Sequence, residues 1–220
     1  MIEQIEIRDL LPCVFAGMED TDRIRSSQIW EEPSFVFHRG CRLCVHAESG
    51  NGKSSLLHFI YGSRKDYKGS ILFDGTDISA LSIAQWCEVR TKGIALLPQD
   101  MALFPELTVG QNIDLKNNMT HHKTREQVKD LLARLGIDDK HDVAAGKLSI
   151  GQMQRVALVR AVCQPFDFIF LDEPVSHLDA RNNKIVADII TEEANSQGAG
   201  IISTSVGNHL MLDNAKFVLL

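Results

Sequence analysis

The segment at residues 47–54, with the sequence AESGNGKS, constrains the fold of this chain more than any other part of its 220 residues. It fits the phosphate-loop pattern GxxxxGK[ST], except that Ala47 stands in place of the first glycine. Apolar residues before the loop predict a strand, and residues 54–61 have helical character. The glycines let backbone N–H groups turn toward phosphate oxygens, and the helix directs its positive end at the same charge. The alternative is a glycine-rich turn that holds no ligand.

This loop predicts the contacts of a bound nucleotide triphosphate. Lys53 can reach the β- and γ-phosphates, and the Ser54 hydroxyl can ligate Mg²⁺. The departure at Ala47 matters only if that position needs a positive φ, which alanine tolerates poorly. We expect nucleotide contacts from the whole loop, which comprises Ala47, Glu48, Ser49, Gly50, Asn51, Gly52, Lys53, Ser54 and Ser55.

Two adjacent carboxylates, Asp172 and Glu173, follow the apolar segment at residues 168–171. Alone, this pattern is typical of a buried strand that reaches its polar end. Beside a phosphate loop, Asp172 stands where a Mg²⁺ ligand is expected. Glu173 is then placed to polarise the water that attacks the γ-phosphate.

The order of strands and helices predicts the fold class. Helices are expected at residues 108–115, 124–135, 150–162 and about 181–195, with Gly136 ending the second, and a polar loop is expected at residues 17–28. Strands are expected at residues 2–7, 34–37, 41–47, 69–75, 167–171, 200–204 and 216–220. The sequence therefore predicts one α/β domain over residues 1–220: a P-loop NTPase core, a small antiparallel β subdomain near the N-terminus, and an inserted helical subdomain at about residues 98–163.

The sequence KLSIGQMQRVALVRA at residues 147–161 resembles the signature of the ATP-binding cassette (ABC) ATPases, LSGGQ followed by a helix of the type QRVALARA. The resemblance implies an ABC-type core in which Ser149, Gly151 and Gln152 contact the nucleotide held by a second subunit. Ile150 replaces a glycine but can still donate its backbone N–H. The alternative is an ordinary helix that Ser149 caps.

Further matches extend the resemblance over most of the chain. The sequence LLPQ at residues 96–99 looks like the Q-loop, so Gln99 is implied to touch Mg²⁺ or water and to link to a transmembrane partner. The sequence SHLD at residues 176–179 looks like the D-loop, which implies that Asp179 lies at a dimer seam. Residues 103–113 resemble a segment typical of transporter subunits, LFPxLTVxxNI.

Two positions depart from the family pattern. Phe15 is the candidate for stacking on adenine, and burial of its ring in the core is the alternative. Ser205 stands where the family has a switch histidine, so weaker sensing of the γ-phosphate or slower turnover is expected. In that case Ser205→His should speed hydrolysis. His209 takes the role only if the loop shifts its register.

The resemblance implies that the chain is the ATP-binding and ATP-hydrolysing subunit of an ABC transporter, with ATP and Mg²⁺ as cofactors. Lys53, Gln99 and Glu173 are the implied catalytic residues, and Ser54, Gln99 and Asp172 the implied metal ligands. The implied partners are transmembrane permease subunits and a second, identical or different, ATP-binding subunit. No appended regulatory domain is expected.

Two other functional classes stay open. One is an ATPase that regulates a membrane partner without transport, as in cell-division complexes; within the transporter family, a slow, partly degenerate ATPase is a further alternative. The other is a nucleic-acid machine, against which the net charge of −6 and the lack of basic blocks argue. The odd number of cysteines, five, favours a reducing compartment. We therefore expect a cytoplasmic protein on the inner face of the cell membrane, bound to no nucleic acid.

Overall fold

The structure is a computed structural model, which describes residues 1–18 and 21–220. It contains an antiparallel four-stranded sheet in the order β2-β1-β4-β5 and a parallel five-stranded sheet in the order β6-β7-β8-β3-β9. The first comprises β1 (Gln4–Pro12), β2 (Ser34–His38), β4 (Tyr67–Phe73) and β5 (Thr76–Asp77). The second comprises β3 (Arg42–His46), β6 (Ile94–Leu97), β7 (Phe168–Leu171), β8 (Gly200–Ser205) and β9 (Lys216–Leu219).

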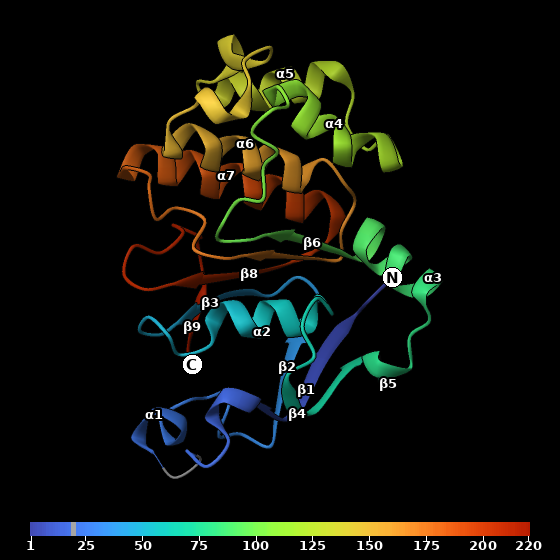
Figure 1. The fold of residues 1–220 in the computed structure, drawn as a ribbon, viewed down its shortest axis with the longest axis vertical. Coiled ribbons are helices and arrows are strands. Elements are labelled where there is room, and N and C mark those ends of the chain that lie inside the picture. The colour runs from blue at the N-terminus through green and yellow to red at the C-terminus, as the bar shows by residue number, and fades with distance from the viewer. Residues whose placement is uncertain (19–20) are drawn as a thin grey trace.

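The helices form layers on both sides of the parallel sheet (Figure 1). Helix α2 (Lys53–Ile60) lies between the two sheets, where Leu56 and Phe59 join a core cluster with residues of both. The opposite face is covered by α6 (Ile150–Val162) and α7 (Ala180–Gln197). Beyond them lie α4 (Val109–Thr120) and α5 (Arg125–Arg134). The predicted P-loop α/β architecture is therefore confirmed.

The helix ends follow local sequence signals. Thr108, Thr124 and Ser149 each begin a helix through a capping box with the residue three positions later. Gly136 has a φ of 64° just after α5, in the left-handed conformation that favours glycine. The three helix starts and the end of α5 agree with the boundaries that the sequence predicts, whereas α4 continues to Thr120, beyond the predicted end at residue 115.

Two α-helices of the described residues were not expected from the sequence. Within the polar segment 17–28, α1 (Asp22–Arg25) forms and buries Ile24, which is 2 % exposed; Glu19 and Asp20 of that segment lie outside the described residues. Helix α3 (Ile83–Glu88) continues into a π-helix at Val89–Gly93. Helix α3 has only six residues, which are too few for apolar periodicity to predict a helix.

Within residues 1–18 and 21–220, no helix combines the length and the apolar character that crossing a membrane requires.

Candidate functional site

Four parallel strands end at one edge of the sheet, and the predicted site residues follow them there. The register pairs Leu97 with Leu171, Leu171 with Ser203, and Val45 with Thr204. In a parallel sheet the carboxyl ends lie together, and ligands bind in the crevice outside them. The fold thus brings the phosphate loop, Gln99, the Asp172–Glu173 pair and the end of β8 to one side of the molecule.

The phosphate loop joins β3 to α2 with the expected backbone. Gly50 and Gly52 have φ values of 85° and 91°, and Gly52 is the N-cap of α2. Ala47 is not among the residues with a positive φ, so its departure from the pattern carries no backbone strain. The Lys53 ammonium donates hydrogen bonds of 2.9 Å to the carbonyl oxygens of Ala47 and Glu48. These bonds hold the lysine within the loop that would receive phosphate oxygens.

The pKa of Lys53, in the phosphate loop, depends on burial and on the charges of Asp172 and Glu173. Lys53 is 5 % exposed, and burial lowers the pKa of its ammonium group. The charges of Glu173 and Asp172 raise the pKa, but less than burial lowers it. Both carboxylates therefore lie close enough for their charges to act on the Lys53 ammonium.

Asp172 presents one satisfied and one unsatisfied carboxylate oxygen. The residue is 2 % exposed, and its Oδ1 accepts a hydrogen bond of 2.6 Å from the Thr204 hydroxyl. Its Oδ2 is buried and has no hydrogen-bond partner within residues 1–18 and 21–220. Such an oxygen is costly unless a cation or water satisfies it. The chemistry of this oxygen fits Mg²⁺, which protein sites typically hold through one or two carboxylates together with phosphate oxygens and water.

Glu173 has a left-handed backbone with a φ of 49°. This conformation costs about 1–2 kcal/mol for a residue other than glycine. Its backbone N–H donates a hydrogen bond of 3.0 Å to the Thr204 hydroxyl, which also binds Asp172. Thr204 is thus a site residue that our sequence reasoning missed. The only feature of the sequence that could have indicated Thr204 is a hydroxyl residue near the end of an apolar strand.

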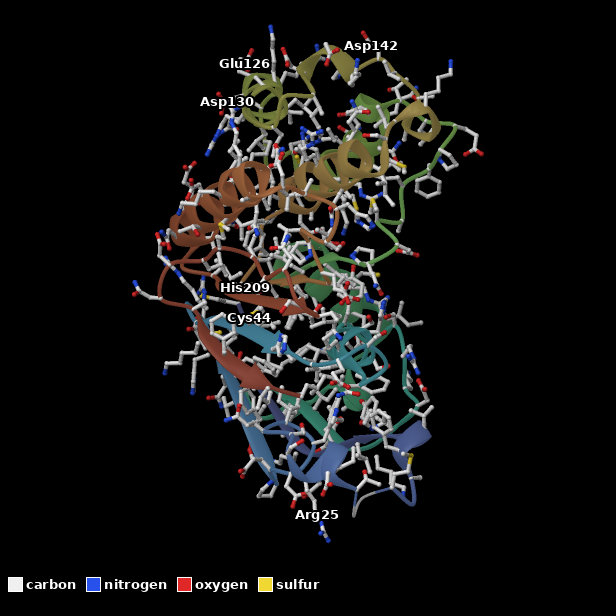
Figure 2. The ribbon with its side chains drawn as sticks, turned by 90° about the vertical axis from the view of Figure 1, so that its left-hand side faces the viewer. Arg25, Cys44, Glu126, Asp130, Asp142 and His209 are labelled. Carbon is white, nitrogen blue, oxygen red and sulfur yellow. The ribbon has the colours of Figure 1, made fainter. Side chains whose placement is uncertain are left out.

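Ser205 points away from these carboxylates. It is 1 % exposed, and its Oγ lies 3.4 Å from His46 Nδ1 and 3.5 Å from Cys44 Sγ. Successive strand residues point to opposite faces of a sheet, so Ser205 and Thr204 cannot share a face. The ring of His209, labelled with Cys44 in Figure 2, packs edge-on against Phe217 at 5.1 Å between centroids.

The start of α6 lies beside the loop at residues 176–179. The exposed Ser149 accepts a hydrogen bond of 3.3 Å from Gln152 N–H, and Gln152 Oε1 accepts one of 2.9 Å from Ser149 N–H. A Cβ at Gly151 would lie 3.2 Å from the His177 carbonyl oxygen, so the absence of a side chain permits this close approach. Asp179 caps α7 by accepting from Asn182 N–H, and this bond lowers the pKa of its carboxyl group.

The aromatic Phe15 is buried rather than open to a base. It is 4 % exposed, and its ring would lie 3.4 Å from a Cβ at Gly52. Trp30, which our sequence reasoning missed, would lie 3.3 Å from the same Cβ, and its Nε1 donates to the Asn51 carbonyl at 3.2 Å. The structure thus agrees with the alternative in which the Phe15 ring is buried in the core. A cleft of about 570 Å³ opens beside the loop, lined in part by His46, Ala47, Glu48, Ser49, Asn51, Asp22 and Ser26.

Two remaining site candidates differ in their surroundings. Ser55 Oγ accepts a hydrogen bond of 2.9 Å from Arg64, so its hydroxyl is already engaged. Gln99 follows β6 and is exposed. The segment after it is held by Arg160 of α6, which donates to the carbonyls of Met101 at 2.6 Å and Ala102 at 2.7 Å.

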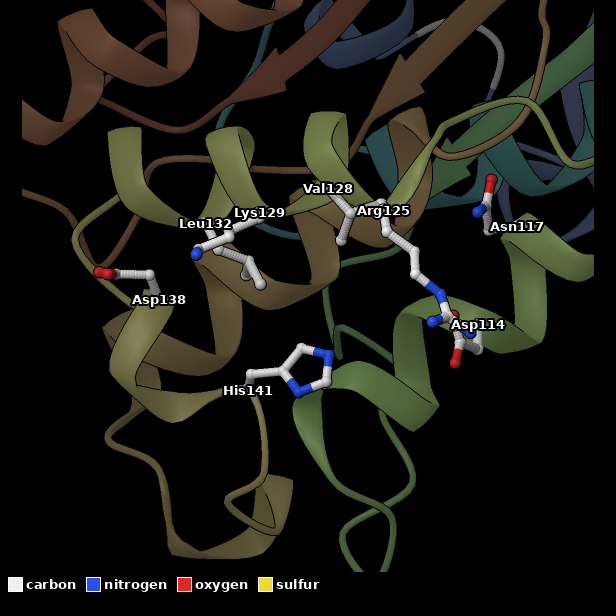
Figure 3. A pocket seen from close by; sticks show the side chains of 8 residues that line it. All are labelled: Asp114, Asn117, Arg125, Val128, Lys129, Leu132, Asp138 and His141. Atoms are coloured by element: carbon white, nitrogen blue, oxygen red, sulfur yellow. The ribbon is translucent and has the colours of Figure 1, made fainter.

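A separate cavity of about 440 Å³ lies between α4, α5 and the loop after them (Figure 3). Its charged lining is balanced between two acidic and two basic side chains. It is lined by Asp114, Asn117, Arg125, Val128, Lys129, Leu132, Asp138 and His141. Figure 2 shows acidic Glu126, Asp130 and Asp142 at the same end of the molecule. No phosphate-loop residue lines this cavity, so it is not part of the candidate site.

Comparisons with known proteins give a consistent result. A family model described as "ABC transporter" matches residues 30–176. The ABC transporter ATP-binding protein YtrE of Bacillus subtilis is 28 % identical over 195 residues, which cover 87 % of this chain and 84 % of YtrE. A lipoprotein-releasing system ATP-binding protein, LolD of Buchnera aphidicola, is 32 % identical over 162 residues, which cover 72 % of this chain and 71 % of LolD.

Solved structures share the fold. The dimeric structure of MJ0796, a bacterial ABC transporter cassette, superimposes with a TM-score of 0.75 and 18 % identity, covering 98 % of this chain and 94 % of the other. A bacterial Atm1-family ABC exporter with ATP bound gives a TM-score of 0.71 and 22 % identity, covering 99 % of this chain and 37 % of the exporter chain.

Proposed function

Since the chain belongs to the ABC transporter family and is an ATP-binding ATPase of that family, we propose that it energises transport through separate transmembrane subunits. The observation that carries the proposal is the buried Asp172 carboxylate, whose Oδ2 has no hydrogen-bond partner among the described residues, at the sheet edge where the phosphate loop holds Lys53. The proposal extends from hydrolysis to transport because the relatives YtrE and LolD are named as ATP-binding proteins of an ABC transporter and a releasing system.

The proposed mechanism assigns most of the rate to positioning and charge stabilisation, since phosphoryl transfer leaves little covalent chemistry to a protein. Lys53 leaves the carbonyls of Ala47 and Glu48 and binds the β- and γ-phosphate oxygens. The loop N–H groups and the start of α2 stabilise the same charge. Glu173 orients the attacking water and accepts its proton.

Mg²⁺, when bound, supplies neutralisation of charge on the phosphate oxygens. Ser54, Gln99 and Asp172 are the residues that would hold it. Asp172 Oδ2 supports this assignment because it is buried and has no hydrogen-bond partner among the described residues. Thr204 keeps the other oxygen, Oδ1, occupied.

We propose that a second ATP-binding subunit completes the site. Ser149 is exposed at the start of α6, where backbone N–H groups and the helix dipole favour an anion. Its hydroxyl accepts from Gln152 but keeps its own proton to donate. Ser149, Gly151 and Gln152 of one subunit would then meet the γ-phosphate bound by the other, with Asp179 near the seam.

The transmembrane partner would dock near Gln99 on the inner face of the membrane. The segment after Gln99 exposes Phe104, which is 52 % exposed. Leu115 and Met119 are 46 % and 57 % exposed and stand four residues apart on α4, so they share one helix face. Exposed apolar side chains in this region are suited to contact another protein.

A second candidate function is regulation of a membrane partner by slow hydrolysis. The orientation of Ser205 toward Cys44 and His46 favours it, because no charged group from that position reaches the phosphates. A nucleic-acid machine fits poorly with a net charge of −6.

Purification of the chain from solubilised membranes separates these classes. Recovery with an integral membrane protein is expected for a transporter or a regulator. Transport of a substrate in vesicles that contain the purified complex, dependent on ATP hydrolysis, then distinguishes the first from the second. Recovery with DNA or ribosomes, and without a membrane protein, would contradict both.

A further inference from the structure

We propose that Gln154 of α6 is a positioning residue that sets the backbone of Glu173 and so aims its carboxylate. The inference rests on the proposed role of Glu173 in hydrolysis. Gln154 lies one turn inside α6, as the first residue of the segment that resembles QRVALARA, and the resemblance implied no role for its side chain. It is 5 % exposed, so its amide is buried among protein groups.

Both the nitrogen and the oxygen of the Gln154 amide form hydrogen bonds with the loop that follows β7. Its Nε2 donates to the Glu173 carbonyl at 3.0 Å and to the Ser176 hydroxyl at 3.3 Å. Its Oε1 accepts a hydrogen bond of 3.2 Å from the His177 N–H. One side chain therefore ties α6 to a loop that begins with Glu173 and ends with the cap of α7.

These bonds act on a backbone that would otherwise relax. Glu173 has a φ of 49°, a conformation that persists in residues other than glycine only where the surroundings determine it. The Thr204 hydroxyl accepts from its N–H, and the Gln154 amide donates to its carbonyl. The Ser176 hydroxyl and N–H also donate to that carbonyl, but they belong to the same loop and move with it. Gln154 and Thr204 are thus the side chains that fix this peptide from other elements.

The direction of the Glu173 side chain follows from this backbone geometry. A shift of about 1 Å in a catalytic group can cost about 100-fold in rate. Loss of the Gln154 bonds should therefore lower kcat, while the phosphate loop, which these hydrogen bonds do not involve, keeps its affinity for ATP.

The test compares Gln154→Met and Gln154→Glu with a matched control, Gln164→Met. Gln154→Met keeps the volume and loses both hydrogen-bonding ends. Gln154→Glu keeps the acceptor for His177 N–H and replaces the donor with an oxygen that faces the Glu173 carbonyl. Gln164 is also a buried glutamine, 1 % exposed, which donates to the Ile94 carbonyl at 3.1 Å and accepts from Lys116 at 2.6 Å. It follows α6 and lies beside Ile94 at the start of β6, away from the edge that holds the site.

We expect both Gln154 variants to lose about 10- to 100-fold in kcat per folded molecule, with the Kd for ATP changed by less than about 2-fold. Gln164→Met should lose stability and keep its kcat per folded molecule. An unchanged kcat in Gln154→Glu, or an equal fall in the control, would overturn the inference. A wild-type chain that shows no turnover would instead overturn the proposed function.

Discussion

The Thr204 hydroxyl donates a hydrogen bond of 2.6 Å to Asp172 Oδ1, and Oδ2 of the same carboxylate is buried without a partner in the part of the chain that the structure describes. Thr204 is 1 % exposed, so water does not compete for its hydroxyl. The bond fixes the carboxylate in one orientation. In that orientation Oδ2 is the oxygen left to meet a cation, which makes Thr204 a determinant of the Mg²⁺ site.

Thr204→Val removes this hydroxyl at nearly constant volume. It leaves Asp172 Oδ1 and Glu173 N–H unsatisfied, which should lower the free energy of unfolding by about 1–3 kcal/mol. The Mg²⁺ concentration needed for half-maximal hydrolysis should rise about 10-fold, since a looser carboxylate loses about 1.4 kcal/mol of binding. Titration of ATPase activity with Mg²⁺ and urea denaturation measure the two effects. Thr204→Ser retains the hydroxyl and should stay close to wild type; an equal effect in both variants would argue against the hydroxyl.

Lys53→Met tests whether the buried charge of Lys53 lowers the stability of the folded chain while it provides binding of phosphate at the loop. Burial lowers the pKa of Lys53 in the folded chain, so the unfolded chain binds the proton more tightly. At pH values below the folded pKa, burial of the charged ammonium destabilises the folded chain in full. As the pH rises toward the ordinary pKa of lysine, this destabilisation disappears. The variant should therefore gain stability relative to wild type at neutral pH, and this gain should shrink at alkaline pH.

The same variant should lose the thermal stabilisation that ATP gives the wild-type chain, because its phosphate ligand is gone. Thermal unfolding with and without ATP, at neutral and alkaline pH, provides both readouts. Retained stabilisation by ATP in Lys53→Met would remove Lys53 from the phosphate site.

The part of the site that the sequence predicts consists of residues next to one another in the chain. The phosphate loop, the strand before Asp172 and the cap at Ser149 are each encoded by spacing within about ten residues. Thr204, Gln154 and Trp30 act through partners that are distant in sequence: Thr204 contacts Asp172, Gln154 contacts Glu173, and Trp30 contacts Asn51. Their residue types carry no sign of such contacts.

The fold shows the same division. Strands and helices with an apolar face were predicted, including the helix that Gly136 ends. Helix α3 was missed because it has only six residues, although Ser82 and Gln85 form a capping box at its start. The sequence also did not predict the direction of the Ser205 side chain, because the apolar pattern of a buried strand does not show which face of the sheet lies toward the candidate site.

Ser205→His is expected to harm rather than help this chain. The sequence alone suggests that a histidine at this position would speed hydrolysis. In the structure Ser205 is 1 % exposed and contacts Cys44 and His46, so an imidazole would overfill the site. We expect a loss of about 1–3 kcal/mol in the free energy of unfolding and no gain in kcat. Faster hydrolysis by a stably folded variant would restore the original expectation.

The most direct test of the account is hydrolysis by Glu173→Gln, which preserves the size of the side chain and removes its ability to accept a proton. Equilibrium ATP binding, single-turnover hydrolysis and the mass of the complex in solution are measured together. We predict ATP affinity close to wild type, a fall in hydrolysis of about 100-fold or more, and a stable dimer in the presence of ATP and Mg²⁺. Hydrolysis at the wild-type rate would contradict the assignment of Glu173 as the base, and with it the central claim.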